Sequence, residues 1–278
     1  SAVPGALGSG SAAPVPAAPS ARTSKPSFLR VVWDFTRPHT IVGSVLSVVS
    51  LHLFAAGATG LGVLNLTVLG IAMLWALIPA CLINLYVTGL NQVCDVDIDK
   101  INKPYLPIPS GQLSVSLANK LVWGSLVLGL LLPMAFYPFG KGPLMATIGG
   151  SSLLGTIYSM PPLRLKRFPL MAALCIIAVR GTVINLGFYA HAASALGGPL
   201  MPARALACAV FFGIFGVVIA LMKDVPDVEG DALFEIRTFS VRLGARRVLG
   251  VAAGLLSVTF MSSALGLLGA ALWPNALG

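Results

Sequence analysis

Charged residues are scarce in this chain. Asp, Glu, Lys and Arg make up only 10% of its 278 residues, and nine of these are acidic. A typical water-soluble domain has about 25% charged residues. Hydrophobic residues account for 56% of the chain, and its mean hydropathy is +0.90. This composition excludes an ordinary soluble protein and predicts a protein embedded in a lipid bilayer.

Cysteine and histidine are also few, with four and three residues. The cysteines stand singly, at Cys81, Cys94, Cys175 and Cys208. None forms a C-x-x-C pair, which argues against both a zinc site and a disulfide framework. Because no two histidines have metal-ligand spacing, we interpret them as structural.

Long apolar runs follow one another along most of the chain and are separated by short polar loops. They lie near residues 41–57, 68–90, 117–137, 144–160, 170–192, 203–222 and 248–273. As helices, runs of this length cross about 30 Å of hydrocarbon. We therefore predict an all-α fold, a transmembrane bundle of about seven helices around a central cavity, in one domain over residues 28–278. Residues 1–27 are rich in Ala, Ser, Pro and Gly and contain no acid, which favours a disordered tail or a transit-peptide remnant.

The few acids are clustered. Seven of the nine fall in two stretches, N-Q-V-C-D-V-D-I-D from Asn91 to Asp99 and K-D-V-P-D-V-E-G-D from Lys223 to Asp231. Each stretch closes an apolar run. If the helices continue through the stretches, each places three polar side chains on one face, three or four residues apart. The two stripes are Asn91, Asp95 and Asp99, and Asp224, Asp227 and Asp231.

Like charges at this spacing repel by roughly 0.2 to 0.5 kcal/mol per pair, so the stripes indicate a compensating cation. Mg²⁺ is the simplest candidate, because proteins typically hold it with one or two carboxylates plus substrate phosphates. Basic side chains on the same predicted membrane face as the two stretches could bind the oxygens of a diphosphate that the metal ions bridge. These are Arg37, Lys103, Arg164, Lys166 and Lys223.

Counting membrane crossings places both acidic stretches on the same side of the bilayer. That side receives fifteen of the eighteen Lys and Arg residues and all nine acids. By the positive-inside rule, it faces cytosol, or stroma or matrix in an organelle. The chain has a net charge of +9, and the orientation of its helices in the membrane accounts for where its basic residues lie. The positive charge therefore does not require a nucleic-acid partner.

Arg180 is the one basic residue in the interior of an apolar run, since Lys120 and Arg204 lie close to the ends of theirs. Because a charge within the membrane is costly unless it is paired, such a residue is a functional candidate. Arg180 is a candidate anchor for an acidic aromatic acceptor, and Asn185 on the same run is a candidate for the same pocket. A structural partner for Arg180 is an equally open alternative. Apolar walls would keep water from a cationic fragment formed when the diphosphate leaves.

The two stripes resemble the motifs N-x-x-x-D-x-x-x-D and D-x-x-D-x-x-x-D of the UbiA superfamily of intramembrane aromatic prenyltransferases. More narrowly, N-Q-V-C-D-V-D-I-D-K-I-N-K-P-Y-L-P, L-G-T-I-Y-S-M-P-P-L-R-L-K-R-F-P and K-D-V-P-D-V-E-G-D are similar to the homogentisate prenyltransferases of plastids. The Y-S-M-P-P-L-R-L-K-R-F-P loop and the V-R-G around Arg180 most resemble the homogentisate solanesyltransferases. The likeness covers about residues 28–250.

The resemblance implies Mg²⁺-dependent transfer of a long prenyl group, solanesyl favoured, from its diphosphate to homogentisate with loss of carbon dioxide, in plastoquinone biosynthesis. It implies a multi-pass protein among the lipids of a plastid membrane, with its active-site face toward the stroma. By the same resemblance the six stripe residues hold metal and diphosphate, and the carboxylates carried over as catalytic are Asp95, Asp99, Asp224 and Asp227. Lys103, Arg164 and Lys166 would meet the phosphates. Gln92, where many relatives carry Asp, removes one possible ligand.

The resemblance also implies nine membrane helices, so we expect the last two to be missing from a chain that ends at Gly278. Other activities stay open within the family: phytyl or geranylgeranyl transfer to homogentisate in tocopherol and tocotrienol biosynthesis, and a chlorophyll synthase-like transfer. Outside enzymes, the alternatives are a membrane cation transporter and a non-catalytic lipid-binding scaffold. Transporter sites usually lie near the bilayer midplane, whereas these acids lie at the ends of spans.

Overall fold

The structure is a computed structural model that describes residues 26–59, 65–138, 141–233 and 238–272. Every regular element in these ranges is helical, which confirms the predicted class. In chain order the elements are α1 (Phe28–Phe35), α2 (Pro38–Thr59), α3 (Leu66–Cys94), α4 (Val96–Asn102), α5 (Val115–Phe136), α6 (Gly142–Ser159), the 3₁₀ helix η1 (Leu165–Arg167), α7 (Pro169–Ile177), the π-helix η2 (Ala178–Val183), α8 (Ile184–Leu196), α9 (Ala203–Met222), α10 (Val228–Leu233), α11 (Phe239–Leu243) and α12 (Ala245–Leu272). The tail predicted at residues 1–27 lies outside the described residues, apart from its last two.

Each of the seven predicted apolar runs forms a helix. By length and composition, six helices in the described ranges are able to cross a membrane: Pro38–Thr59, Leu66–Cys94, Val115–Phe136, Pro169–Leu196, Ala203–Met222 and Ala245–Gly269. The seventh run forms α6, in which Gly, Ser and Thr make up half of the 18 residues. It is too polar to belong with the six, yet it packs inside the bundle against α3 and α8.

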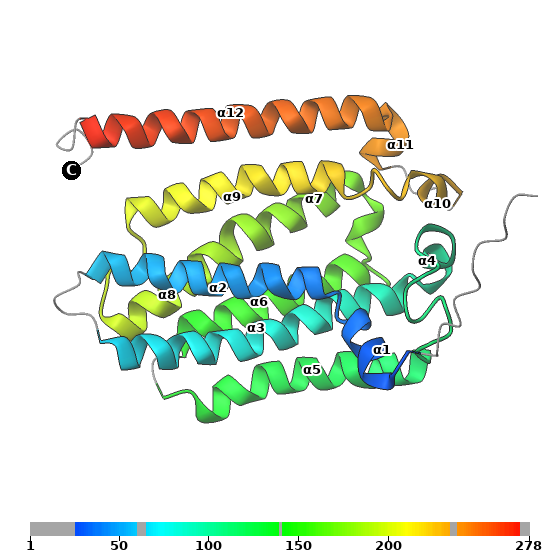
Figure 1. The fold of residues 1–278 in the computed structure, drawn as a ribbon, viewed down its shortest axis with the longest axis horizontal. Coiled ribbons are helices and arrows are strands. Elements are labelled where there is room, and N and C mark those ends of the chain that lie inside the picture. Colours follow the sequence, from blue (N-terminus) through cyan, green and yellow to red (C-terminus); the bar gives the residue numbers. More distant parts are fainter. Residues whose placement is uncertain (1–25, 60–64, 139–140, 234–237, 273–278) are drawn as a thin grey trace, which may run out of the picture.

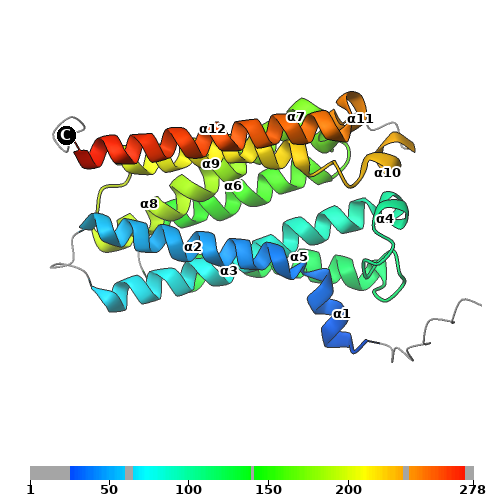
Figure 2. The ribbon, with the colours of Figure 1, turned by 45° about the horizontal axis from the view of Figure 1, so that its top comes forward.

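The long helices lie side by side in one bundle (Figure 1). Packing between α2, α3, α6 and α8 forms the main core, in which Val48, Ile83, Ile148 and Phe188 are all buried. Helix α5 packs against the outer side of α3, and α12 lies along α9 at the opposite edge (Figures 1 and 2). This order leaves α2, α3, α6 and the α7–α8 segment around the middle of the bundle.

The short helix α1 packs against α3 and α5 near one end of the bundle (Figure 2). Its buried residues, Val31 and Phe35, are four positions apart, so they share one face of the helix. This face joins a second core cluster with Tyr86 and Leu90 of α3 and Val122 of α5. Gln92 is fully buried, and its amide donates a 2.9 Å hydrogen bond to the carbonyl of Phe35. The connection fixes α1 beside the end of α3.

The acidic stretches do not continue their helices, contrary to the helical spacing used in the sequence prediction. Helix α3 ends at Cys94, Asp95 has non-helical backbone angles (φ −116°, ψ 17°), and α4 starts anew at Val96. Helix α9 ends at Met222, and α10 begins only at Val228. The second break contains Pro226, which lacks a backbone N–H and disfavours helical angles in the residue before it.

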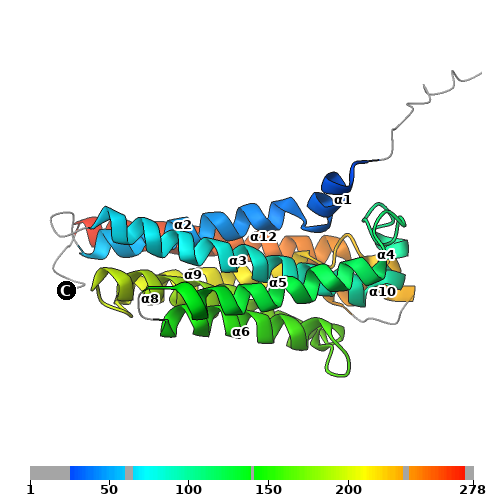
Figure 3. The ribbon, with the colours of Figure 1, turned by 90° about the horizontal axis from the view of Figure 1, so that it is seen from below.

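Both breaks lie at the same end of the bundle, as the parity of the crossings predicts. Helices α4 and α10 contact each other there, although they are far apart in sequence (Figures 2 and 3). Each turns back from the end of a long helix. The fold therefore places two acid-bearing corners next to each other.

Candidate functional site

Helices α4 and α10 are joined by hydrogen bonds to the backbone. The side-chain oxygen of Asn102 accepts a 3.0 Å hydrogen bond from the N–H of Gly230, and its amide donates at 3.4 Å to the carbonyl of Asp227. A Cβ atom on Gly230 would lie only 2.2 Å from Asn102 Oδ1. Any larger residue at position 230 would therefore have to displace the Asn102 side chain from this junction.

Lys103 connects the two acidic stretches through its side chain. Its Nζ lies 2.5 Å from Asp227 Oδ2 and 3.8 Å from Asp99 Oδ1. All three side chains are at most about one-fifth exposed, so solvent screens this contact weakly. The structure thus brings one predicted phosphate-binding lysine together with a predicted ligand from each stretch.

Asp95 is held from the loop that follows α6. Arg164 donates a 2.8 Å hydrogen bond to Asp95 Oδ1, and Lys166 contacts Oδ2. The Arg164 guanidinium also lies 3.5 Å from the carbonyl of Cys94, where α3 ends. These contacts compensate for the helix break and place two predicted phosphate-binding residues at the first stretch.

The remaining acids of the stripes are buried, whereas the two acids of these stretches that lie off the stripes, Asp97 and Glu229, are exposed. Asp99, Asp224 and Asp231 are 5%, 8% and 7% exposed, whereas the side chains of Asp97 and Glu229 lie on the surface. The side chain of Lys223 contacts that of its neighbour Asp224. Although the helices break, the two corners still direct the stripe residues inward.

Burial and like charges perturb the pKa values of these carboxyl groups. Burial raises the pKa of Asp231 to about 6, and the nearby charges of Asp224 and Asp227 add to the rise. Burial also raises the pKa of Asp99; Lys103 and Arg37 oppose this rise, whereas Asp95 and Asp227 add to it. Carboxyl groups of the two stretches therefore interact electrostatically, and the predicted Arg37 lies close enough to act on Asp99.

Two observations show that these residues fit a cation. Asp227 Oδ1 is buried and has no hydrogen-bond partner, although the other oxygen of the group contacts Lys103. Asn91 donates its amide to Ser159 Oγ at 3.3 Å, which leaves the amide oxygen, the atom that a metal would use, without a hydrogen-bond partner among the described residues. Within the described ranges no three His, Cys, Asp or Glu side chains converge on a ready-made metal position. Lysine and arginine now neutralise much of the acidic charge.

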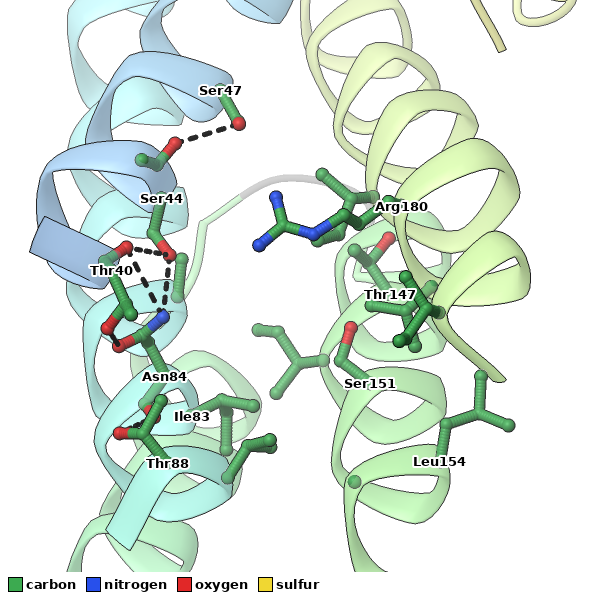
Figure 4. Close-up of a pocket in the computed structure, with 18 of the residues that line it drawn as sticks. Thr40, Ser44, Ser47, Ile83, Asn84, Thr88, Thr147, Ser151, Leu154 and Arg180 are labelled. Atoms are coloured by element: carbon green, nitrogen blue, oxygen red, sulfur yellow. Dashed lines mark hydrogen bonds between the residues drawn. The ribbon is translucent and has the colours of Figure 1, made fainter. Parts of the chain in front are cut away.

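A cavity of about 520 Å³ opens in the middle of the bundle between α2, α3, α6 and the α7–α8 segment (Figure 4). Ile83, Ile148 and Phe188 give it apolar walls. Tyr158 also lines it and interacts with Lys223 and Asp224, so one residue of the cavity wall is next to the second acidic stretch. The walls and position of the cavity suit an apolar substrate whose charged group lies at the acidic corners.

Arg180 lines this cavity, as the predicted role requires, but Asn185 does not. The Asn185 side chain instead donates to the backbone carbonyl of Arg180 within the π-helical turn. The cavity also has a polar face that the sequence analysis did not identify. Thr40, Ser44 and Asn84 form a hydrogen-bonded group there (Figure 4). The sequence did contain a signal for this polar face. Asn84 lies in the middle of an apolar run, where a polar side chain is costly unless it is hydrogen-bonded.

Comparison with known families gives a match over most of the chain. The model of the family described as "UbiA prenyltransferase family" matches residues 44–278. Among solved structures, a UbiA homolog from Archaeoglobus fulgidus bound to GPP and Mg²⁺ aligns with a TM-score of 0.62. The alignment covers 83% of this chain and 75% of that one at 20% identity. At this identity, the likeness concerns the fold alone.

Curated relatives are more similar in sequence. A homogentisate phytyltransferase of Arabidopsis thaliana is 42% identical over 84% of this chain, and the homogentisate solanesyltransferase of the same plant is 42% identical over 85%. A homogentisate geranylgeranyltransferase of Hordeum vulgare is 40% identical over 85%. The matched regions are 58%, 60% and 58% of those proteins, so the chain spans about three-fifths of their length.

Proposed function

The chain belongs to the UbiA prenyltransferase family, and from this premise we propose that it transfers a prenyl group from a prenyl diphosphate to homogentisate. Relatives that use homogentisate with phytyl, solanesyl and geranylgeranyl donors have nearly equal identity to the chain, which supports the acceptor. In the reaction, the bond between the prenyl carbon and the diphosphate oxygen breaks, and a bond to a ring carbon forms. The ring loses a proton, and the side chain loses carbon dioxide and gains a proton.

The observation that carries this proposal is the junction of the two acidic stretches through Lys103. A cationic side chain within 2.5 Å of Asp227 and 3.8 Å of Asp99 marks a place where acidic and basic groups from both halves of the chain meet. A diphosphate is negatively charged and its metal is positively charged. The basic groups at this place would suit the diphosphate, and the acidic groups would suit the metal. The contact therefore supports a diphosphate site between α4 and α10.

The residues proposed to hold Mg²⁺ are Asn91, Asp95, Asp99, Asp224, Asp227 and Asp231. When bound, Mg²⁺ supplies positive charge that stabilises the leaving diphosphate. Lys103, Arg164, Lys166, Lys223 and Arg37 are the proposed contacts to the phosphate oxygens. Four of them, Lys103, Arg164, Lys166 and Lys223, now form short ion pairs with stripe carboxylates, so a phosphate group would compete with these carboxylates for basic groups that are already in position.

The cavity supplies the second half of the proposed mechanism. Its apolar walls would exclude water from the prenyl cation that develops as the diphosphate leaves. Homogentisate would lie in the same cavity, with its ring beside the first carbon of the donor. Holding both reactants in one closed space lowers the entropic cost of their encounter.

The reaction class does not by itself determine which prenyl chain length the protein prefers. The solanesyl preference predicted from the loop at Arg164 stays a prediction, because the phytyl and geranylgeranyl enzymes are equally similar to the chain. The related chloroplastic enzymes and the apolar helices support a place in a plastid membrane. The stromal orientation of the charged end rests on the positive-inside rule.

An assay of the purified chain in detergent tests the proposal. Mg²⁺, homogentisate and each of the three donors are supplied, and the products are identified by mass. We expect Asp95→Asn and Asp227→Asn to lower product formation at least about a hundredfold, because each removes a carboxylate proposed to hold the Mg²⁺ whose positive charge stabilises the leaving group. Asp97→Asn is the matched control, since its side chain is 80% exposed and pairs with Lys100. Metal-dependent donor binding without any product would favour the lipid-binding scaffold instead.

A further inference from the structure

The central cavity contains a second set of polar groups, separate from those of the acidic corners. We propose that Arg180 and the α2–α3 polar group, which consists of Thr40, Ser44 and Asn84, recognise opposite ends of a hydroxyaryl acid. Arg180 binds the carboxylate of the acceptor, and the polar group accepts hydrogen bonds from its ring hydroxyls. This inference rests on the proposed function, because it names the acceptor subsite of the same cavity.

Hydrogen bonds hold the α2–α3 polar group together across two helices. Asn84 Nδ2 donates to Ser44 Oγ at 3.0 Å and to the carbonyl of Thr40 at 3.4 Å. Ser44 Oγ donates to the carbonyl of Thr40 at 3.3 Å. The Thr40 hydroxyl lies 2.8 Å from Asn84 Oδ1 and 2.9 Å from the carbonyl of Arg37. The group is therefore fixed in place before any ligand arrives.

The same contacts determine which ligand atoms the group is able to bind. Each side-chain donor hydrogen of Thr40, Ser44 and Asn84 has an acceptor within the protein. Lone pairs remain on Asn84 Oδ1 and Ser44 Oγ, because an amide oxygen accepts two hydrogen bonds and a hydroxyl oxygen also accepts two. A ring hydroxyl, which donates, suits this face, whereas a carboxylate, which only accepts, does not.

Arg180 offers hydrogen-bond donors and a positive charge, whereas the α2–α3 polar group offers acceptors. Its guanidinium carries five N–H donors, and no carboxylate in the described parts of the chain forms a salt bridge with it. Figure 4 shows the side chain extending from the α7–α8 segment toward the face of α2 and α3. An unpaired cation within a membrane bundle is costly, and a bound carboxylate would supply the missing partner.

The backbone around Arg180 is shaped to present this side chain. The residue lies in the π-helical turn η2, and Asn185 donates to its carbonyl. Next to it, Gly181 lies so close to α9 that an added Cβ would be 2.7 Å from the Cα of Gly213. Such turns are rare in helices and occur frequently at functional sites. Asn185 thus positions Arg180 instead of contacting the acceptor.

The acceptor held in this way would lie beside the diphosphate site. Asn84 precedes Asn91 on α3 by seven residues, or about 10 Å along the helix. Tyr158 lines the same cavity and interacts with Lys223 and Asp224 of the second stretch. An aromatic ring between Arg180 and Asn84 therefore faces the end of the cavity where the first carbon of the donor would be.

Analogues of homogentisate that lack either the carboxylate or the ring hydroxyls test the two halves of the subsite separately. The purified chain is first titrated with Mg²⁺ and geranylgeranyl S-thiolodiphosphate, which resists ionisation. This step tests the proposed function alone. Homogentisate, 2-methylhydroquinone without the carboxylate, and phenylacetate without the hydroxyls are then titrated calorimetrically into that complex. We expect homogentisate to bind about 10- to 100-fold more tightly than either truncated ligand.

Two variants complete the test. Arg180→Met is expected to weaken homogentisate about 10- to 100-fold and to leave 2-methylhydroquinone unchanged. Asn84→Leu is expected to weaken homogentisate and 2-methylhydroquinone but to leave phenylacetate unchanged. Arg180→Lys should recover part of the affinity for homogentisate. Arg204→Met and Asn119→Leu are matched controls, because Arg204 lies over Phe54 and Asn119 bonds its own helix, both outside the cavity wall.

The outcomes separate the two proposals. If the thiolodiphosphate does not bind, the proposed function fails and the subsite fails with it. If it binds and both variants bind homogentisate like the unaltered chain, the subsite is wrong while the donor site stands. Equal losses for all three ligands would show a structural role for Arg180 and Asn84, and would also overturn the subsite.

Discussion

The ammonium group of Lys103 lies 2.5 Å from Asp227 Oδ2, although 124 residues separate the two in the sequence. Lys103 directly follows α4, and Asp227 directly precedes α10, so this contact joins the two corners of the bundle. The second contact of Lys103, to Asp99, is longer at 3.8 Å. One cation therefore balances carboxylates of both stretches, and four predictions concern this end of the bundle and the helices that support it.

Replacing Lys103 with Met removes the charge that the stretches share. We expect the KM for the prenyl diphosphate to rise about tenfold or more, because charge-assisted hydrogen bonds are worth roughly 1.5 to 3 kcal/mol. Lys100→Met is the matched control, since Lys100 pairs with the exposed Asp97 on the other side of α4. Initial rates at varied donor concentration provide the measurement. Equal effects of the two substitutions would show that only overall charge matters.

A methyl group at Gly230 would displace the Asn102 side chain that joins the two corners. The added Cβ of Gly230→Ala would lie 2.2 Å from Asn102 Oδ1 and break the bond between Asn102 and the Gly230 N–H. We expect metal-dependent donor binding to weaken at least about tenfold, since the two sets of ligands would no longer meet. Gly124→Ala is the control, because nothing lies within 4 Å of a Cβ there. Unchanged donor binding in Gly230→Ala would mean that the site does not depend on this approach.

The sequence was sufficient to predict the helical class, the positions of the helices and the common end of the acidic stretches, because apolar length and crossing parity fix these features. It did not predict the break at Asp95. At this break Asp95 contacts Arg164 and Lys166, which are about 70 positions away in the sequence, so no local pattern reveals the arrangement. The polar group at Asn84 was not predicted either, because Thr40 and Ser44 contact Asn84 only when α2 packs on α3. The role of Asn185 follows from a π-helical turn that no local pattern marks.

Gly181 and Gly213 face each other across η2 and α9, and their unequal surroundings give a paired prediction. A Cβ on Gly181 would lie 2.7 Å from the Cα of Gly213, whereas a Cβ on Gly213 would lie 3.9 Å from the Cα of Gly181. Gly181→Ala forces backbones apart, so we expect it to destabilise the protein by about 1 to 3 kcal/mol. Gly213→Ala should be neutral or slightly stabilising, because alanine favours the helix. Thermal unfolding in detergent measures both, and equal melting temperatures would contradict the close approach.

Removing Mg²⁺ should abolish turnover without unfolding the chain. Lys103, Arg164 and Lys166 already neutralise part of the acidic charge, so the repulsion left after chelation is small. In Lys103→Met this compensation is incomplete, and Mg²⁺ bound to the folded state then stabilises it by linkage. We therefore expect Mg²⁺ to raise the melting temperature more in Lys103→Met than in the unaltered chain, with Lys100→Met behaving like the latter. Melting curves with EDTA and with Mg²⁺ provide the comparison. A collapse of the unaltered chain in EDTA would show that the cation is structural and that the lysine contacts do not replace it.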